Sequence, residues 1–207
     1  MDIVDFEAVP WGNAYLNISD CQASATPGLP PGAWDRGVIR CWIDLCSGDK
    51  PPESCWMGDA PQAVCQHGAT ECAFNLMEAC AVETLDSQAD QVNFVICMEN
   101  KAEGSERDAE AAAKACATQV GVSADGVLAC YGSADGVKAQ RDMAQRTVAL
   151  GSSRPGTPWV VVDGQALQDV SALLQAVCNA YTGAKPAGCS PAASKASNMC
   201  TIDAPSA

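Results

Sequence analysis

Residues 65–80 read Cys-Gln-His-Gly-Ala-Thr-Glu-Cys-Ala-Phe-Asn-Leu-Met-Glu-Ala-Cys, and this stretch decides how the rest of the chain is interpreted. At about 100° per residue along a helix, Cys65, Cys72 and Cys80 fall on one apolar stripe. We therefore predict a helix from Cys65 to about Val82. Its cysteines should point inward, which is the arrangement of structural disulfides.

The charged residues of the same stretch should face solvent. Glu71 and Glu78 lie on the side of the predicted helix opposite the cysteines. His67 is the only histidine of the chain, and a metal site or a proton relay beside Cys65 is conceivable. A structural role near the helix start is favoured for His67, as for Glu71 and Asn75. Zinc bound by cysteines is disfavoured because no C-x2-C pair exists, and we expect no cofactor.

The cysteine content indicates an oxidising compartment. The 207 residues include 13 cysteines, which suits a disulfide framework and not a reducing cytosol. An odd number leaves at least one cysteine free, bonded to another chain, or separated from a partner in a missing segment. The net charge is −13 with no basic run, so we expect neither a nucleic-acid nor a membrane partner. No apolar run approaches the roughly 20 residues that span a bilayer.

Two further observations concern the secretory pathway. Asn17-Ile18-Ser19 is the only N-x-[ST] sequon and predicts glycosylation at Asn17. The first residues, Met1 to Glu7, have neither the basic nor the uninterrupted apolar region of a signal peptide. A disulfide-rich chain without a signal peptide is expected to be incomplete.

The region before the signature divides into a strand and an insertion. Ile3–Pro10 is rich in β-formers and ends at a turn signal, which predicts a strand. Residues 17–64 are rich in Pro, Gly, Asp and Trp and have little apolar periodicity. Such a segment needs covalent support to offset its ordering entropy, so we predict two local disulfides among its four cysteines: Cys21, Cys41, Cys46 and Cys55.

The region after the signature alternates helices with one strand. Helices are predicted at Ala109–Val120 and, as one or two elements, within 123–150. Trp159–Val162 reads as a buried strand that is followed by a turn at Asp163-Gly164. The apolar residues of 170–181 recur at helical spacing with Asp169 as the cap. Residues 184–207 have no core pattern and are predicted to be a flexible tail.

The spacing C-Q-H-G-x2-E-C-x2-N-x4-C resembles the signature of the gamma-interferon-inducible lysosomal thiol reductase (GILT) family. It is formed by Cys65, Gln66, His67, Gly68, Glu71, Cys72, Asn75 and Cys80. Residues 9–14, Val-Pro-Trp-Gly-Asn-Ala, and residues 144–147, Ala-Gln-Arg-Thr, are similar to other segments of that family.

The resemblance implies an α/β, thioredoxin-like fold with an inserted helical subdomain, here lacking the first strand and the first helix. Residues 1–16 and 65–183 would form this domain, with the helical subdomain at about 65–150 and the extra insertion at 17–64. It also implies a lysosomal or secreted enzyme that reduces disulfides in protein substrates. Pro158 would occupy the position of the family's cis-proline, and Thr157 would present its backbone to substrate.

The catalytic element of such an enzyme is absent from these 207 residues. Disulfide exchange uses a nucleophilic thiolate and a nearby resolving thiol, which the family supplies as C-x-x-C or C-x-x-S. No C-x-x-C occurs, the nearest cysteines are Cys41 and Cys46, and the C-x-x-S matches at Cys21 and Cys130 lie in unsuitable places. We predict no catalytic residue in this chain and little reductase activity.

Nine cysteines fall where the family has them: Cys65, Cys72, Cys80, Cys97, Cys116, Cys130, Cys178, Cys189 and Cys200. Nine cannot all pair with one another, and Cys200 is the candidate for a bond across a disulfide-linked dimer. A rival interpretation is a non-enzymatic, disulfide-rich secreted binding module on the same scaffold. Its contact surface would be the tryptophans of the insertion: Trp34, Trp42 and Trp56.

Overall fold

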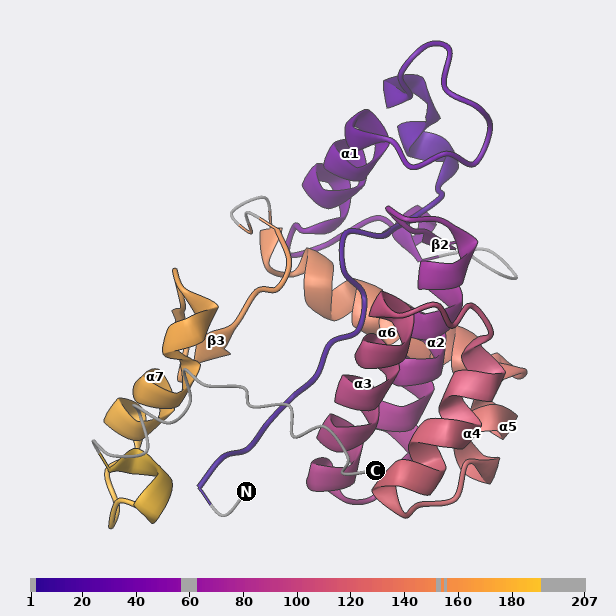
Figure 1. The fold of residues 1–207 in the computed structure, drawn as a ribbon. Coiled ribbons are helices and arrows are strands. Elements are labelled where there is room, and N and C mark those ends of the chain that lie inside the picture. Colours follow the sequence, from indigo (N-terminus) through magenta and orange to yellow (C-terminus); the bar gives the residue numbers. More distant parts are fainter. Residues whose placement is uncertain (1–2, 57–62, 152–153, 155, 191–207) are drawn as a thin grey trace. The chain divides into compact units, whose positions relative to one another are not determined.

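The computed structural model describes residues 3–56, 63–151, 154 and 156–190. They fall into two compact units, which we call the helical unit (residues 5–157) and the C-terminal unit (residues 158–207 with 1–4). Figure 1 shows the elements of both. None of the helices described in either unit has the length and apolar character needed to cross a bilayer.

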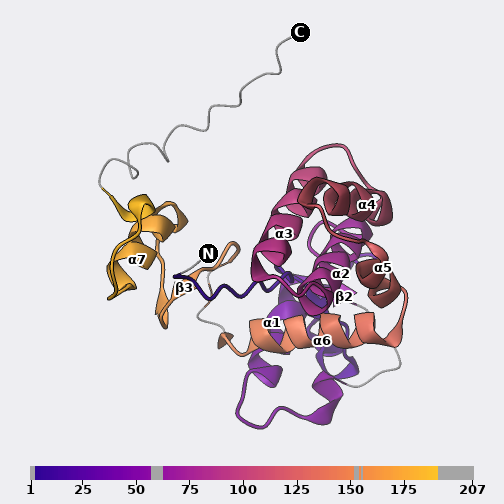
Figure 2. The same ribbon diagram turned by 90° about the horizontal axis from the view of Figure 1, so that it is seen from below.

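The helical unit is built around one central helix. Helix α2 (Ala69–Thr84) packs against each of the four helices that follow it in the chain (Figures 1 and 2). These are α3 (Gln88–Glu103), α4 (Ala109–Val120), α5 (Asp125–Tyr131) and α6 (Ala134–Val148). A short antiparallel sheet of β1 (Tyr15–Leu16) and β2 (Ala63–Val64) leads the chain into α2.

The predicted helix at the signature is confirmed, but it begins four residues later than expected. Gly68 adopts a φ of +94°, and its N–H donates to the carbonyl of Cys65 at 3.1 Å, so residues 65–68 form a turn. Cys65 and Cys80 are buried and Cys72 is half-buried, as the inward stripe predicts.

The expectation that Glu78 faces solvent is wrong. Its side chain is only 1% exposed. Helical periodicity assigns a solvent face only when one side of a helix is uncovered. Helix α2 is surrounded by its neighbours, so its polar side is also packed.

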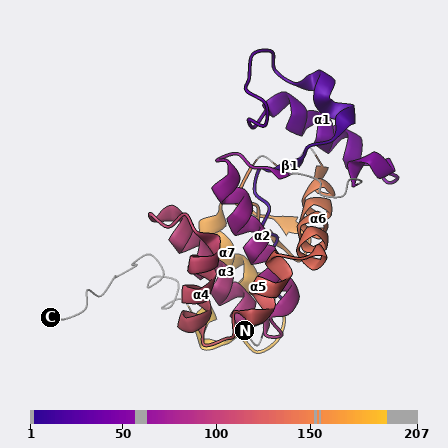
Figure 3. The same ribbon diagram turned by 90° about the vertical axis from the view of Figure 1, so that its right-hand side faces the viewer.

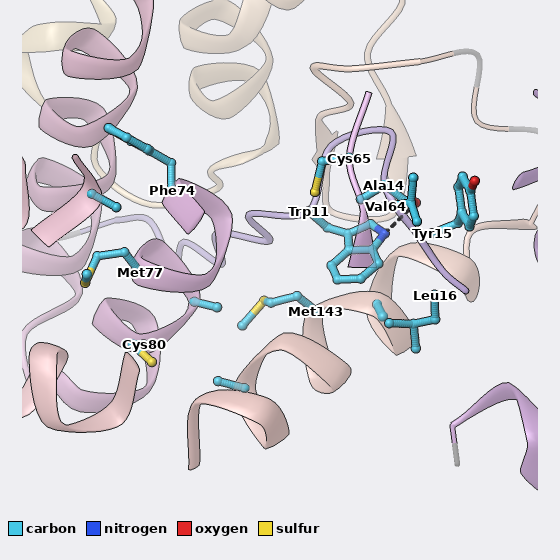
Figure 4. Packing of buried hydrophobic residues seen from close by; sticks show 14 of the residues in the cluster. Trp11, Ala14, Tyr15, Leu16, Val64, Cys65, Phe74, Met77, Cys80 and Met143 are labelled. Carbon is cyan, nitrogen blue, oxygen red and sulfur yellow. Dashed lines mark hydrogen bonds between the residues drawn. The ribbon is translucent and has the colours of Figure 1, made fainter. Parts of the chain in front are cut away.

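Side chains from the sheet and from the helices share one core. Figure 4 shows the indole of Trp11 and the side chain of Leu16 close to Met143 of α6, with Phe74, Met77 and Cys80 along α2. These residues are buried, and the Trp11 indole N–H donates to the carbonyl of Ala14 at 2.9 Å. Burial of large apolar side chains contributes most of the stability of such a unit.

Residues 17–56 form a disulfide-bonded segment on the β1–β2 side of the helical unit (Figures 1 and 3). It contains α1 (Arg36–Cys46) between the 3-10 turns Ser19–Ser24 and Glu53–Cys55. The two predicted local disulfides are confirmed as Cys21–Cys41 and Cys46–Cys55.

The same segment joins the core through contacts between indoles, one tilted and one edge-to-face. The ring of Trp42 lies 6.1 Å from that of Trp11 and 6.4 Å from that of Trp56. Helix α1 is oriented by Asp35, whose carboxylate accepts from the N–H groups of Gly37 and Val38. Hydrogen bonds, the largest from the backbone N–H of Thr26, hold the pKa of Asp35 below its usual value.

The predicted strand at Ile3–Pro10 is wrong. Residues 4–9 have no regular secondary structure, and β1 begins at Tyr15. A strand needs a hydrogen-bonded neighbour, and side-chain contacts hold this segment instead. Arg146 pairs with Glu7 at 2.6 Å, and Gln88 donates to Asp5 at 2.8 Å.

The C-terminal unit contains a hairpin and a short helix. Strands β3 (Val161–Val162) and β4 (Gln165–Ala166) pair across the predicted turn, where Asp163 and Gly164 both have positive φ. The predicted helix at 170–181 is confirmed as a 3-10 turn (Val170–Ala172) that continues into α7 (Leu173–Ala180). Asp169 caps it by accepting from the N–H of Ser171 at 2.9 Å.

The start of the predicted tail is tied to this helix. Cys178 of α7 is bonded to Cys189 in the 3-10 turn Ala187–Cys189. The rest of the tail, residues 191–207, lies outside the described residues. The chain thus combines helices with small antiparallel sheets, the coarse α/β class that the sequence predicts, while the thioredoxin-like arrangement stays a prediction.

Candidate functional site: the cysteine signature at the start of α2

The signature places a disulfide where β2 passes into α2. Cys65 follows β2 directly, Cys72 lies in the first turns of α2, and the two are bonded with a Cα–Cα distance of 5.5 Å. Of the six disulfides among the described residues this one spans the shortest separation, seven residues. It fixes the turn that carries Gln66 and His67.

Glu71 completes this turn from within the helix. Its Oε2 accepts from the backbone N–H of His67 at 2.5 Å and lies 3.1 Å from the His67 Nδ1. A side-chain carboxylate that reaches back to an N–H before its helix satisfies one of the donors left free at a helix start. The imidazole of His67 is 79% exposed, and its described contact is with Glu71.

Two signature side chains bind the segment Trp11–Asn13. The Asn75 amide donates to the carbonyl of Trp11 at 3.2 Å. The Gln66 side-chain oxygen accepts from the Asn13 amide at 2.9 Å. Gly12 has a φ of +63°, and a Cβ at this position would lie 3.3 Å from the Glu71 carboxylate. Only glycine combines that backbone conformation with so close an approach.

Two side chains from distant parts of the sequence complete the arrangement. Trp34, from the disulfide-bonded segment, donates its indole N–H to the carbonyl of Asn13 at 2.6 Å. Arg154 donates to the carbonyl of Gly12 at 3.2 Å. The three consecutive carbonyls of residues 11–13 are therefore each bound by a side chain from a different element, and we call this arrangement the carbonyl clamp.

Arg154 is the permanent positive charge of the clamp. Partial burial lowers the pKa of its guanidinium below the usual value. Arginine nonetheless stays protonated at any physiological pH. Its second donor binds the carbonyl of Gly156 at 3.2 Å, so its described hydrogen bonds go to backbone oxygens.

Sequence reasoning missed part of this site. Asn13, Trp34 and Arg154 were not among the predicted site residues. The conspicuous Val-Pro-Trp-Gly-Asn-Ala stretch pointed to the segment, but nothing in the sequence indicated that Trp34 and Arg154 bind its carbonyls. Both belong to stretches without periodic structure, where spacing carries no information on contacts.

The remaining signature and family cysteines form further bonds. Cys80 of α2 is joined to Cys130 of α5, and Cys97 of α3 to Cys116 of α4. Both cysteines of the C-x-x-S matches are engaged, Cys21 with Cys41 and Cys130 with Cys80, so neither is a free thiol. Cys200 lies outside the described residues.

Three other predicted site residues make none of the contacts that define the clamp. Thr157 and Pro158 are exposed, at the end of the helical unit and at the start of the C-terminal unit respectively. Asn17 is exposed just after β1, and its side-chain oxygen accepts from Gln22 at 2.5 Å. In the part of the chain that the structure covers, no group of three His, Cys, Asp or Glu side chains is arranged to hold a metal ion.

Comparison with known proteins finds similarity along most of the chain. The family model "Gamma interferon inducible lysosomal thiol reductase (GILT)" matches residues 53–120. A gamma-interferon-inducible lysosomal thiol reductase of Mus musculus is 33% identical over 97% of this chain and 64% of its own length. A protein of the same name from Carassius auratus is 32% identical, over 65% of this chain and 54% of its own length.

A plant protein is also similar. The gamma-interferon-responsive lysosomal thiol protein of Arabidopsis thaliana is 30% identical over 61% of this chain and 52% of its own length. The chain spans about half to two thirds of the length of these curated relatives.

Proposed function

This chain belongs to the gamma-interferon-inducible lysosomal thiol reductase (GILT) family, and we propose that it provides the scaffold of a thiol–disulfide oxidoreductase that reduces disulfides in protein substrates. The observation that carries the proposal is the carbonyl clamp. Through it, Asn75 of the signature binds the second family-like segment, residues 9–14, and Gln66 of the signature accepts from the side chain of Asn13 in the same segment.

Within this function the chain supplies the scaffold. Reduction of a substrate disulfide needs a thiolate that attacks one sulfur and a second thiol that releases the mixed disulfide. The sequence has no C-x-x-C, and the twelve cysteines among the described residues are all bonded in pairs. The chain on its own should therefore show little reductase activity.

The finer fold and the substrate platform belong to the same proposal. We place the hairpin and α7 of the C-terminal unit in a thioredoxin-like domain, with Pro158 as its substrate-facing proline and Thr157 presenting backbone groups to an extended peptide. Both residues are exposed, which such a role requires. N-glycosylation at Asn17, a lysosomal or extracellular location and a dimer bond through Cys200 rest on the sequence alone.

An insulin-reduction assay tests the proposed role of the chain. The purified 207-residue chain is incubated with insulin and a small-molecule thiol at acidic pH, and precipitation of the released insulin chain is followed. The rate should equal that of the small-molecule thiol alone. A thioredoxin with an intact C-x-x-C serves as the positive control, and turnover comparable to that control would contradict the placement of the chemistry outside these residues.

The transcript that encodes Met1 separates the enzyme from the rival interpretation. A signal peptide and a C-x-x-C encoded in frame upstream would support the oxidoreductase. An upstream stop codon, or a segment without paired cysteines, would favour the non-enzymatic binding module. Of the three tryptophans that this module would use, Trp42 is 1% exposed, whereas Trp34 and Trp56 are half-buried.

A further inference from the structure

A carboxyl group lies in the interior of the helical unit without a described hydrogen-bond partner. Glu78, in the middle of α2, is 1% exposed. Neither of its carboxyl oxygens has a hydrogen-bond partner among the described residues. Ionisation of a carboxyl group in such a place is costly, because the charge loses its hydration and gains nothing in return.

The basic residues of the surrounding helices do not neutralise this group. Five basic residues lie on the described helices that pack against α2: Lys101 on α3, Lys114 on α4, and Lys138, Arg141 and Arg146 on α6. None of these five forms an ion pair with Glu78. Three of them pair with other carboxylates, since Lys114 contacts Glu110, Lys138 contacts Asp142, and Arg146 contacts Glu7. Neither β2 nor α5 offers a basic residue.

The charged group that acts on Glu78 is another carboxyl group. Glu99 lies on α3, which packs against α2, and after burial its charge is the next cause that raises the pKa of Glu78. Glu99 keeps contact with solvent, and it is itself subject to repulsion from Glu103 on its own helix and from Glu71 on α2. Two carboxyl groups side by side cannot both ionise cheaply, so such a pair retains a proton.

From this arrangement we infer that Glu78 and Glu99 form a proton-binding pair in the helical unit, which contributes to the stability of the folded chain in acidic surroundings and loses that contribution as the pH rises. The inference is independent of any thiol chemistry. It concerns the helix that carries the signature, so the same proton would help to hold the cysteine signature in place.

The direction of the pH dependence follows from linkage. The pKa of Glu78 lies well above its usual value of 4.5. Burial is the largest cause, and repulsion from Glu99 is the next. The folded state therefore binds a proton that the unfolded state releases. The stabilisation is fully present below the unfolded-state pKa of 4.5 and is lost as the pH rises through the raised folded-state pKa.

Thermal unfolding of Glu78→Gln tests this inference. The substitution keeps the shape of the side chain and removes its ionisation, so its melting temperature should match that of the wild type near pH 4.5, the usual glutamate pKa, and exceed it at neutral pH. Within the titration window the difference should grow by about 3–5 °C per pH unit, the effect of one linked proton on a domain of this size.

Three companion variants sharpen the result. Glu83→Gln, at an exposed position of the same helix, should leave the pH dependence of the wild type unchanged. Glu99→Gln removes the repulsion and should reduce the dependence without abolishing it. Glu78→Leu, which cannot ionise either, replaces Glu78→Gln if the amide variant does not fold. A melting-temperature difference that stays constant between pH 4.5 and 7.5 would overturn the inference.

A direct titration makes the inference testable on the wild type alone. Carbon-13 NMR of side-chain carboxyl groups follows each glutamate with pH, and the Glu78 signal is the one missing from Glu78→Gln. It should titrate well above the usual glutamate range. A Glu78 resonance that titrates near 4.5, as in an unfolded peptide, would refute the proton-binding pair whatever the unfolding curves show.

Discussion

Asn75 illustrates how single residues of the signature act on the second family-like segment. Its amide donates to the carbonyl of Trp11, which also accepts from the backbone N–H of Ala14 at 3.4 Å. The carbonyl is therefore not left without a donor when the side chain is removed. The signature asparagine should contribute a normal net hydrogen bond and not the full penalty of a buried unpaired group.

We predict that Asn75→Ala lowers the free energy of unfolding by about 1 kcal/mol, the typical net contribution of such a hydrogen bond. Urea denaturation followed by tryptophan fluorescence measures the change. Asn100→Ala, an exposed asparagine of α3, is the matched control and should change stability by less than about 0.5 kcal/mol. Equal effects of the two substitutions would show that the contact with Trp11 contributes nothing.

The sequence could predict some of these residue roles and not others. The inward direction of Cys80 follows from helical spacing alone, whereas Cys65 is buried in the turn before the helix. The burial of Glu78 does not, because periodicity along one helix carries no information on how many neighbours will cover it. The donors Trp34 and Arg154 reach the clamp from segments whose paths depend on tertiary packing.

Helix α4 shows when the sequence does fix the ends of an element. Its predicted and observed bounds agree, Ala109–Val120. Asp108 before it accepts from the N–H groups of Glu110 and Ala111, and Gly121 after it adopts the left-handed conformation. Both residues are the types that helix ends require. The signature helix lacks such a start signal, because Gly68 precedes it without a capping side chain.

We predict that Asp108→Ala costs about 1 kcal/mol of stability, because two N–H groups at the start of α4 lose their acceptor. Asp108→Asn keeps a side-chain oxygen at the same place and should retain most of that stability. Circular dichroism during thermal unfolding measures both. If the asparagine variant is destabilised as much as the alanine variant, charge and not capping accounts for the effect.

The strand predicted at Ile3–Pro10 failed for a different reason. Its alternation of apolar and acidic residues suits a sheet, but β structure depends on a partner strand that the local sequence does not specify. The observed contacts, Glu7 with Arg146 and Asp5 with Gln88, use the acidic residues of that alternation. Long-range pairing is thus the part of this fold that was least accessible from sequence.

At the scale of the whole molecule, disulfides of different span should contribute differently to stability. Cys80–Cys130 closes a loop of 50 residues and ties α2 to α5. Cys65–Cys72 closes a loop of seven residues. In the chain-entropy model these loops correspond to about 4 and about 2 kcal/mol respectively.

Replacing both cysteines of each pair by alanine tests this expectation. The C80A/C130A variant should unfold at a clearly lower urea concentration than the C65A/C72A variant. Both are compared with the wild type under non-reducing conditions. If the C65A/C72A variant is the less stable of the two, loop closure does not account for the signature disulfide, and the carbonyl clamp must depend on it directly.

The carbonyl clamp also has a consequence for protein engineering. Its three backbone oxygens, those of residues 11–13, accept from Asn75, Arg154 and Trp34 in that order, and the next oxygen, that of Ala14, accepts from the Trp11 indole. Lengthening or shortening the segment by one amino acid would move every oxygen to the wrong donor at once. Epitope tags, permuted termini and grafted loops should therefore be placed elsewhere in the chain.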